Sequence, residues 1–139
     1  MILDESCIFC KIVLKQAPSS MIYEDEKVLA FQDIRPLNLG HSLIIPKDHF
    51  VDIFDIPEKE LAAVHEAAKK LSSSIKNATN ADGISIIQQN GKAAAQDIFH
   101  FHVHVVPRFL GQKLKSFSEL AEIDRPILDE LAQKIRQDL

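Results

Sequence analysis

Short apolar segments separated by turn-forming residues occupy the first half of the chain. Residues 21–24 and 27–32 predict two strands of a hairpin, and the apolar run 43–45 predicts a buried strand. Residues 33–40, which hold proline, asparagine and glycine, predict the loop between them. The pattern in this half of the chain therefore predicts strands of a β-sheet.

The second half adds two helices and more strand. Apolar residues recur three and four positions apart over residues 57–77 and predict a long helix: Leu61, Val64, Ala68, Leu71 and Ile75. Residues 83–89 predict a strand, and 110–123 a loop with a short helical turn. A C-terminal helix from about Asp124 is expected to turn four residues inward: Ile127, Leu128, Leu131 and Ile135. The order predicts a single α+β domain, residues 1–139, with an antiparallel sheet.

Histidine occupies every second position of the run His-Phe-His-Val-His, residues 100–104. On an extended strand the three imidazoles share one face, with Phe101 and Val103 on the other. Strand geometry separates His100 and His104 by ~13 Å at the backbone, whereas a metal ion binds imidazole nitrogen at ~2 Å. At least one histidine is therefore free to act as nucleophile, proton donor or anion ligand, unless the row is simply an exposed sheet face.

Composition narrows the class of protein. The 139 residues are 46% hydrophobic and 26% charged, which is typical of a globular protein, and the net charge of −4 argues against general nucleic-acid binding. No apolar run is long enough to cross a bilayer, so no membrane partner is expected. Residues 1–9 include Asp4 and Glu5 and lack the basic start of a signal peptide, so a cytoplasmic location is expected.

The only two cysteines, Cys7 and Cys10, have Cys-x-x-Cys spacing. In a reducing compartment this spacing indicates half of a metal site or a redox pair. The redox form usually begins a helix of a thioredoxin-like unit, which the flanking sequence does not resemble. A tetrahedral zinc ion would need two further ligands, for which histidine is the expected type.

Beyond these patterns, the histidine run with its following valines resembles the signature of the histidine triad (HIT) family. Further segments resemble bacterial members in the same order, over most of residues 7–108: residues 7–12, 30–34, 40–49, 90–91, Gln96 and 107–108. The resemblance implies a HIT-like α+β fold, usually in a homodimer, for which the 57–77 helix is a candidate interface. It also implies purine nucleotide substrates such as nucleoside phosphoramidates or dinucleoside polyphosphates.

The family resemblance also implies roles at the phosphate. His102 would attack the α-phosphorus and form a nucleotidyl-histidine intermediate, and His104 would donate to a phosphate oxygen or to the leaving group. Asn90 and Gln96 would supply further donors from the preceding loop. Neutral imidazole is the nucleophilic form, and its ordinary pKa of ~6.5 leaves much of it neutral at pH 7.

The nucleoside contacts follow from the same resemblance. Asp33 matches the acceptor of the ribose hydroxyls, and Phe9 and Ile34 match apolar residues of the base pocket, although core packing is an alternative for both. Such contacts predict weak discrimination between purines. His41 matches a supporting position.

In the zinc-binding bacterial branch, the matching ligands would be Cys7, Cys10, His49 and His100. A closed four-ligand site of this type holds structural zinc, which would tether Phe9 to the catalytic strand.

Two positions depart from the family pattern. Ala95 stands where glycine is usual, a mild change if its φ is negative. Asp97, at the phosphate site, stands where serine or threonine is usual, and a carboxylate there repels phosphate. Asp97 is expected to turn away, to be protonated, or to pair with Lys92 or a histidine.

The sequence thus favours a nucleotide hydrolase or transferase. Two alternatives remain: a nucleotide-binding protein with little catalysis, and a metal-dependent hydrolase that uses the triad histidines as ligands.

Overall fold

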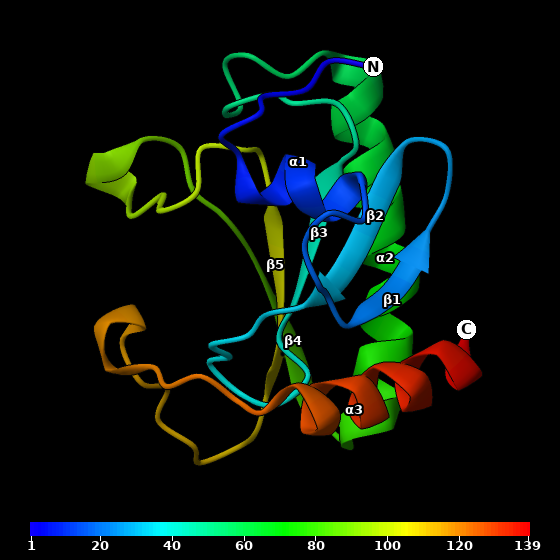
Figure 1. Ribbon diagram of the computed structural model, residues 1–139. Helices are drawn as coiled ribbons and strands as arrows, with labels where there is room; N and C mark the ends of the chain where they lie inside the picture. The colour runs from blue at the N-terminus through cyan, green and yellow to red at the C-terminus, as the bar shows by residue number, and fades with distance from the viewer.

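The computed structural model describes all 139 residues as a five-stranded antiparallel sheet with three helices (Figure 1). The strands are β1 Met21–Glu24, β2 Val28–Gln32, β3 Ser42–Pro46, β4 Gly83–Gln88 and β5 Val103–Arg108, and the helices are α1 Ile8–Val13, α2 Glu58–Thr79 and α3 Arg125–Asp138. The strand order is β1-β2-β3-β5-β4. The α+β prediction with a long helix and a C-terminal helix is confirmed.

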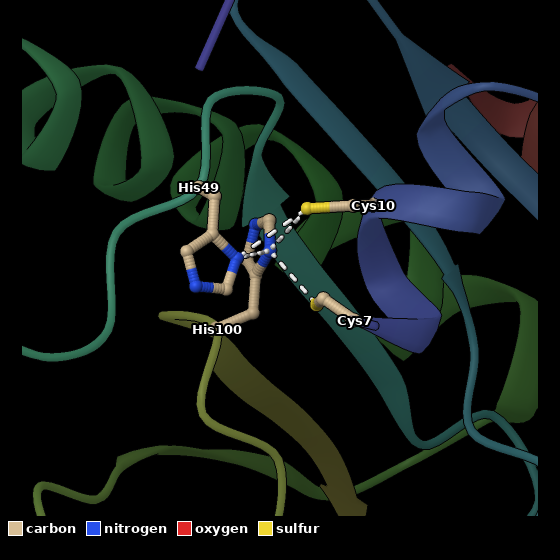
Figure 2. Close-up of side chains that lie close together, drawn as sticks. All are labelled: Cys7, Cys10, His49 and His100. Carbon is tan, nitrogen blue, oxygen red and sulfur yellow. Dashed lines mark hydrogen bonds between the residues drawn. The ribbon is translucent and has the colours of Figure 1, made fainter. Parts of the chain in front are cut away.

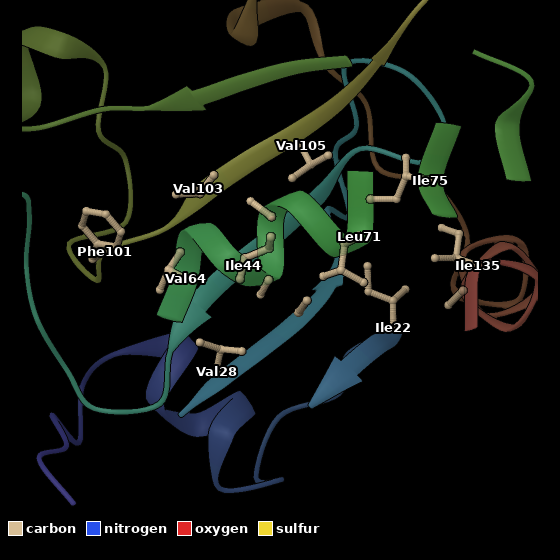
Figure 3. Close-up of a cluster of buried hydrophobic side chains, with 14 of the residues drawn as sticks. Ile22, Val28, Ile44, Val64, Leu71, Ile75, Phe101, Val103, Val105 and Ile135 are labelled. Carbon is tan, nitrogen blue, oxygen red and sulfur yellow. The ribbon is translucent and has the colours of Figure 1, made fainter. Parts of the chain in front are cut away.

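Helix α2 covers one face of the sheet, behind it in Figure 1, and α3 packs beside it. The apolar stripe of α2 is buried, with Val64, Leu71 and Ile75 each at 0% exposure. Figure 3 shows this stripe against strand residues such as Ile44 and Val103. The helix ends at Asn80, whose left-handed φ of 56° is a common helix terminator. Burial of this stripe is the main reason that the long helix forms.

The opposite face carries the short helix α1, in front of the sheet in Figure 1. A second apolar cluster joins Phe9 and Ile12 of this helix to Phe31 and Leu43 of the sheet. The hydrophobic pattern did not predict α1, because six residues are too few to display a helical period. Cys7 is its N-cap, so the cysteine pair lies at the start of this helix.

The strand register lines up four residues across the sheet. Met21 on β1 pairs with Phe31 on β2, Phe31 with Leu43 on β3, and Leu43 with His104 on β5. Adjacent strands lie ~4.8 Å apart, so this row spans ~14 Å. Three of its members, Phe31, Leu43 and His104, line the cavity described below, and Met21 marks the end of the row beyond it.

The histidine run is less regular than predicted. Strand β5 begins at Val103, so His100 and His102 precede it, while the N–H of Phe101 donates to the carbonyl of Phe50 at 2.6 Å. The alternation of faces nevertheless holds, since Phe101 and Val103 lie in the core behind the sheet.

Two expectations about the C-terminal third have different outcomes. A helical turn within residues 110–123 is confirmed at Phe117–Glu119. Ile127 was predicted to face inward but is 49% exposed, because the buried stripe of α3 runs through Leu128, Ala132 and Ile135. None of the helices has both the length and the apolar composition that crossing a bilayer requires.

Candidate active site and metal centre

The middle histidine of the triad is held by a backbone carbonyl. His102 Nδ1 lies 2.7 Å from the carbonyl oxygen of His100. A carbonyl can only accept, so Nδ1 carries the proton and Nε2 of the neutral ring keeps its lone pair. His102 Nε2 faces the same cavity as His104. The backbone thus presents the nucleophilic nitrogen.

A second chain of hydrogen bonds sets the tautomers of His41 and His104. The N–H of Leu37 donates to His41 Nδ1 at 3.0 Å, so the proton of neutral His41 is on Nε2. His41 Nε2 lies 2.9 Å from His104 Nδ1 and donates to it. The proton of His104 must then be on Nε2, which is buried and has no partner within the protein. His104 therefore offers an unused N–H donor beside His102.

Burial keeps these rings neutral. It lowers the pKa of His41 to about 3 and that of His104 to about 4, with neighbouring histidines adding to both shifts. Burial also lowers the pKa of His102, although the hydrogen bond to the His100 carbonyl and the charge of Asp97 oppose that shift. His102 is therefore in the nucleophilic form at neutral pH.

Asp97 lies beside the nucleophilic nitrogen. Its Oδ1 is 3.8 Å from His102 Nε2, and it accepts a hydrogen bond from the N–H of Ile98 at 2.9 Å. The structure therefore places Asp97 next to a histidine, as one of the expected arrangements did, but without a hydrogen bond, because the carboxylate oxygen and Nε2 of neutral His102 are both acceptors. The Asp97 side chain is 78% exposed, so water screens its charge.

A cavity of about 500 Å³ opens in front of the triad, within the size range of small-molecule sites. Its lining includes His102, His104, Asp97, Phe9, Asp33, Ile34, Ile12, Phe31, Leu43, Phe117, Leu120 and Arg125. The ring of Phe9 stands edge-on to His102, with 5.3 Å between centroids. Apolar walls and a few polar groups are what a nucleoside pocket requires.

Asp33 brings a carboxylate into this cavity. Burial raises its pKa to about 6, with the charge of Asp97 adding to the shift and the N–H of Arg35 opposing it. Its Oδ2 lies 3.5 Å from His41 Nε2. The carboxylate is thus positioned next to the histidine chain and ionises near neutral pH.

The loop before the triad contains two residues with positive φ, Gly91 at 88° and Ala95 at 69°. Alanine in place of the family's glycine was expected to be a mild change only if φ at residue 95 is negative. That condition is not met, and alanine in the left-handed region costs on the order of 1 kcal/mol. Gln96 is buried and braces this loop: its Oε1 accepts from Gly91 N–H at 2.7 Å and its Nε2 donates to the carbonyl of Val51 at 2.7 Å.

Four potential metal ligands converge around the first histidine of the triad (Figure 2). Cys7 and Cys10 come from the start of α1, His49 follows β3, and His100 precedes β5. Their ligand atoms all lie within 4.8 Å of one another. His100 Nε2 is 2.8 Å from the carbonyl oxygen of Pro46, which leaves Nδ1 free to ligate.

The spacing of these four ligands fits zinc. Zn–S bonds of ~2.3 Å and Zn–N bonds of ~2.1 Å give tetrahedral edges of about 3.6 Å for S···N and about 3.4 Å for N···N. The S···N distances here are 3.5 Å from Cys7 to His100, 3.6 Å from Cys10 to His100 and 3.4 Å from Cys10 to His49. The His49–His100 N···N distance is 3.2 Å.

Residues 14–111 match the HIT domain family. The chain belongs to this family. It is therefore a member of a superfamily of nucleotide-binding proteins and nucleotide hydrolases.

Two solved HIT structures resemble this fold over nearly its whole length. A HIT-like protein from Bartonella henselae is 37% identical, with a TM-score of 0.91 over 99% of each chain. A Zn-bound histidine triad family protein from Mycobacterium smegmatis is 42% identical, with a TM-score of 0.85 over 96% of this chain and 92% of that chain. Among sequence relatives, an adenylylsulfatase of Arabidopsis thaliana is 41% identical over 106 residues, which are 76% of this chain and 54% of that protein.

Most predicted HIT site residues meet in space. The cavity holds His102, His104, Asp97, Phe9, Asp33 and Ile34, and the metal group holds Cys7, Cys10, His49 and His100. Asn90 and Gln96 do not line the cavity. The side chain of Asn90 bonds to Gln88 and to the N–H of Ile53, so direct phosphate contacts from these two amides stay predictions.

Several site residues gave no signal in the sequence. The N–H of Leu37 sets the His41 tautomer, and Asp4 Oδ2 lies 3.9 Å from His49 Nε2 behind the metal group. Phe117 stands against His104, with ring centroids 5.7 Å apart, and Arg125 reaches the cavity from α3. Such contacts depend on tertiary folding, and no local sequence pattern predicts them.

Proposed function

We propose that this HIT protein is a hydrolase or transferase that releases nucleoside 5′-monophosphates from nucleoside phosphoramidates or dinucleoside polyphosphates. The observation that carries the proposal is the hydrogen bond from His102 Nδ1 to the His100 carbonyl, which leaves Nε2 as a nucleophile facing the cavity. The relationship to an adenylylsulfatase agrees with cleavage at a nucleotidyl phosphorus.

In the first step, the lone pair of His102 Nε2 forms a bond to the α-phosphorus, and the bond from phosphorus to the leaving nitrogen or oxygen breaks. The ring then carries positive charge, which the His100 carbonyl stabilises through Nδ1–H. His104 Nε2–H donates to a phosphate oxygen or to the leaving group. In the second step, the oxygen of a water molecule bonds to phosphorus as the bond from phosphorus to His102 Nε2 breaks. The proton of that water passes to solvent, which also protonates the departed leaving group, and the nucleoside monophosphate leaves with His102 neutral again.

The nucleoside would occupy the apolar part of the cavity. Asp33 would accept from the two ribose hydroxyls, for which an ionised carboxylate has enough lone pairs. Phe9 and Ile34 would contact the base, and His41 would position His104 through their 2.9 Å hydrogen bond.

Zinc is the metal that the ligand group of Cys7, Cys10, His49 and His100 would hold. With four protein ligands such a site is closed, so zinc would supply stability and no open coordination position. The same short helix carries both cysteines and Phe9, so bound metal would fix one wall of the nucleoside pocket.

We also propose that residues 1–139 form one domain and assemble as a homodimer. Strand β4 lies at the edge of the sheet and pairs only with β5, so its outer backbone groups are free to pair with a second copy. The cytoplasmic location stays a prediction.

A nucleotide-binding protein with little catalysis is the second candidate. The Asp97 carboxylate, 3.8 Å from His102 Nε2, favours it because a phosphate at that nitrogen would meet like charge. Metal-dependent hydrolysis by the triad has less support, since His102 and Asp97 lie outside both groups of converging potential ligands. That alternative predicts turnover that a chelator abolishes.

The test compares turnover of adenosine 5′-phosphoramidate and a diadenosine polyphosphate by wild type, His102→Ala and Asp97→Ser. The proposal predicts at least a thousandfold loss in His102→Ala, on the order of other lost nucleophiles, with AMP binding retained. Equal, negligible rates in wild type and His102→Ala, with turnover gained in Asp97→Ser, would instead identify a binding protein.

A further inference from the structure

Arg125 lines the proposed nucleotide cavity without a direct ion pair. Its side chain lines the cavity, is only partly exposed and forms no ion pair with a carboxylate. It is also the first residue of α3, where the helix dipole disfavours a positive charge. Neither the helix nor a salt bridge accounts for an arginine at this position.

One hydrogen-bond chain fixes the direction of the Arg125 side chain. Arg125 Nη1 donates to Ser20 Oγ at 3.0 Å, and Ser20 Oγ donates to Asp129 Oδ1 at 2.6 Å. Ser20 is buried at 2% exposure, and its carbonyl accepts from the N–H of Gln32 on β2. The guanidinium has five N–H donors, so four remain after the bond to Ser20.

The sheet register places this guanidinium at the end of the cavity away from the triad. Ser20 directly precedes Met21, the β1 end of the row that runs through Phe31 and Leu43 to His104. Three strand spacings of ~4.8 Å each separate the two ends of that row. Asp33, which is 3.5 Å from His41, lies on the triad side of Ser20.

We infer that Arg125 reads the edge of the base and makes the pocket prefer purines that carry a 6-oxo group. The inference rests on the proposed function: phosphorus at His102 and ribose at Asp33 leave the base to reach the far end. Arginine pairs bidentately with guanine O6 and N7, which are both acceptors. Adenine has an amino donor in place of O6, which opposes the guanidinium donors. The apolar contacts alone predicted weak discrimination between purines.

Calorimetric titration of the zinc-loaded full chain with GMP, IMP and AMP tests this inference. IMP has O6 and N7 but lacks the 2-amino group, so it should bind like GMP. We expect GMP and IMP to bind on the order of tenfold tighter than AMP, the lower part of the range for one bidentate arginine contact.

Substitutions test whether the Arg125 side chain causes the preference for GMP and IMP over AMP. Arg125→Met should bring the three affinities within about twofold, with AMP affinity nearly unchanged, and Arg125→Lys should retain only part of the preference. Arg136→Met is the matched control on the same helix, because Arg136 bonds to the Met21 carbonyl and does not line the cavity. It should keep the wild-type preference, and thermal melting checks that each variant folds.

Equal binding of GMP and AMP by wild type, or a GMP preference that survives in Arg125→Met, would overturn the role of Arg125 and leave the proposed function intact. Failure of all three nucleotides to bind would overturn the proposed function, and this inference with it.

Discussion

His100 and His102 are two residues apart in the same motif, yet the fold gives them opposite tautomers. His100 donates through Nε2 to the Pro46 carbonyl and turns Nδ1 toward two cysteines and a histidine. His102 donates through Nδ1 to the His100 carbonyl and turns Nε2 toward the cavity. A backbone carbonyl therefore decides whether each imidazole can serve as a metal ligand or as a nucleophile.

The comparison also shows how the two regions are coupled. Phe9 stands edge-on to both rings, with centroids 5.9 Å from His100 and 5.3 Å from His102. Its helix begins at Ile8, directly after Cys7 of the metal group. The proposed metal group and the proposed nucleotide cavity are thus chemically separate but share Phe9 as one wall.

Substitution of His100 should have the largest effect and should separate the two regions. His100→Ala removes one of the four proposed zinc ligands, so we expect loss of stoichiometric zinc and of at least about 3 kcal/mol of unfolding free energy. His102→Ala should retain one zinc per chain and nearly wild-type stability. Metal analysis and chemical denaturation measure both, and zinc loss in both variants would contradict the division of roles.

Removal of the hydrogen bond to His104 should have the next largest effect. His41→Phe takes away the donor to His104 Nδ1 and lets the His104 tautomer change, so kcat should fall about 10- to 100-fold. Zinc content should not change, and His41→Gln should recover part of the rate. Steady-state kinetics would contradict the role of His41 if only KM rose in His41→Phe.

The pKa of Asp33 provides a test of ribose binding in the cavity. The Asp33 carboxyl, whose pKa burial raises to about 6, loses an acceptor as it protonates below that pH. AMP affinity should therefore fall by up to about tenfold between pH 7 and pH 5 relative to 2′,3′-dideoxy-AMP, which lacks the ribose hydroxyls. The ratio of the two dissociation constants cancels phosphate titration. A ratio independent of pH would exclude Asp33 as the ribose acceptor.

The smallest expected effect concerns the loop that precedes both histidines. Ala95→Gly relieves a left-handed alanine but adds freedom to the unfolded chain, for a net gain of about 0.5 kcal/mol in unfolding free energy. Ala93→Gly is the matched control in the same loop, where φ is not positive, and should destabilise by a similar amount. Denaturant unfolding compares the two, and equal effects would mean that the backbone of residue 95 is not strained.

Sequence pattern was sufficient for the elements that bury a long apolar stripe or a whole strand. Helix α2 and strands β2 and β3 follow the hydrophobic pattern closely. Helix α1 was missed because its six residues show no period, and Ile127 was placed inward because the pattern could not tell which side of the α3 stripe would be covered.

The candidate site likewise has a part that the sequence predicted and a part that it did not. The motif and the family resemblance identified the histidines and cysteines, and the structure brings Cys7 within 3.5 Å of His100, 93 residues away in the chain. The tautomers of His41 and His100 could not be predicted from the sequence, because they depend on single backbone groups, the N–H of Leu37 and the carbonyl of Pro46. The contact of Asp97 with His102 was one of several open alternatives, since only the folded loop fixes that distance.

Intact-protein mass spectrometry during turnover of adenosine 5′-phosphoramidate tests the role of His102 most directly. Phosphorus–nitrogen bonds to imidazole survive alkaline denaturation, so a rapid alkaline quench preserves the intermediate. The account predicts one adenylyl group on wild type, mapped to His102 by fragmentation, and none on His102→Ala. An adduct on another residue, or wild-type turnover by His102→Ala, would contradict it.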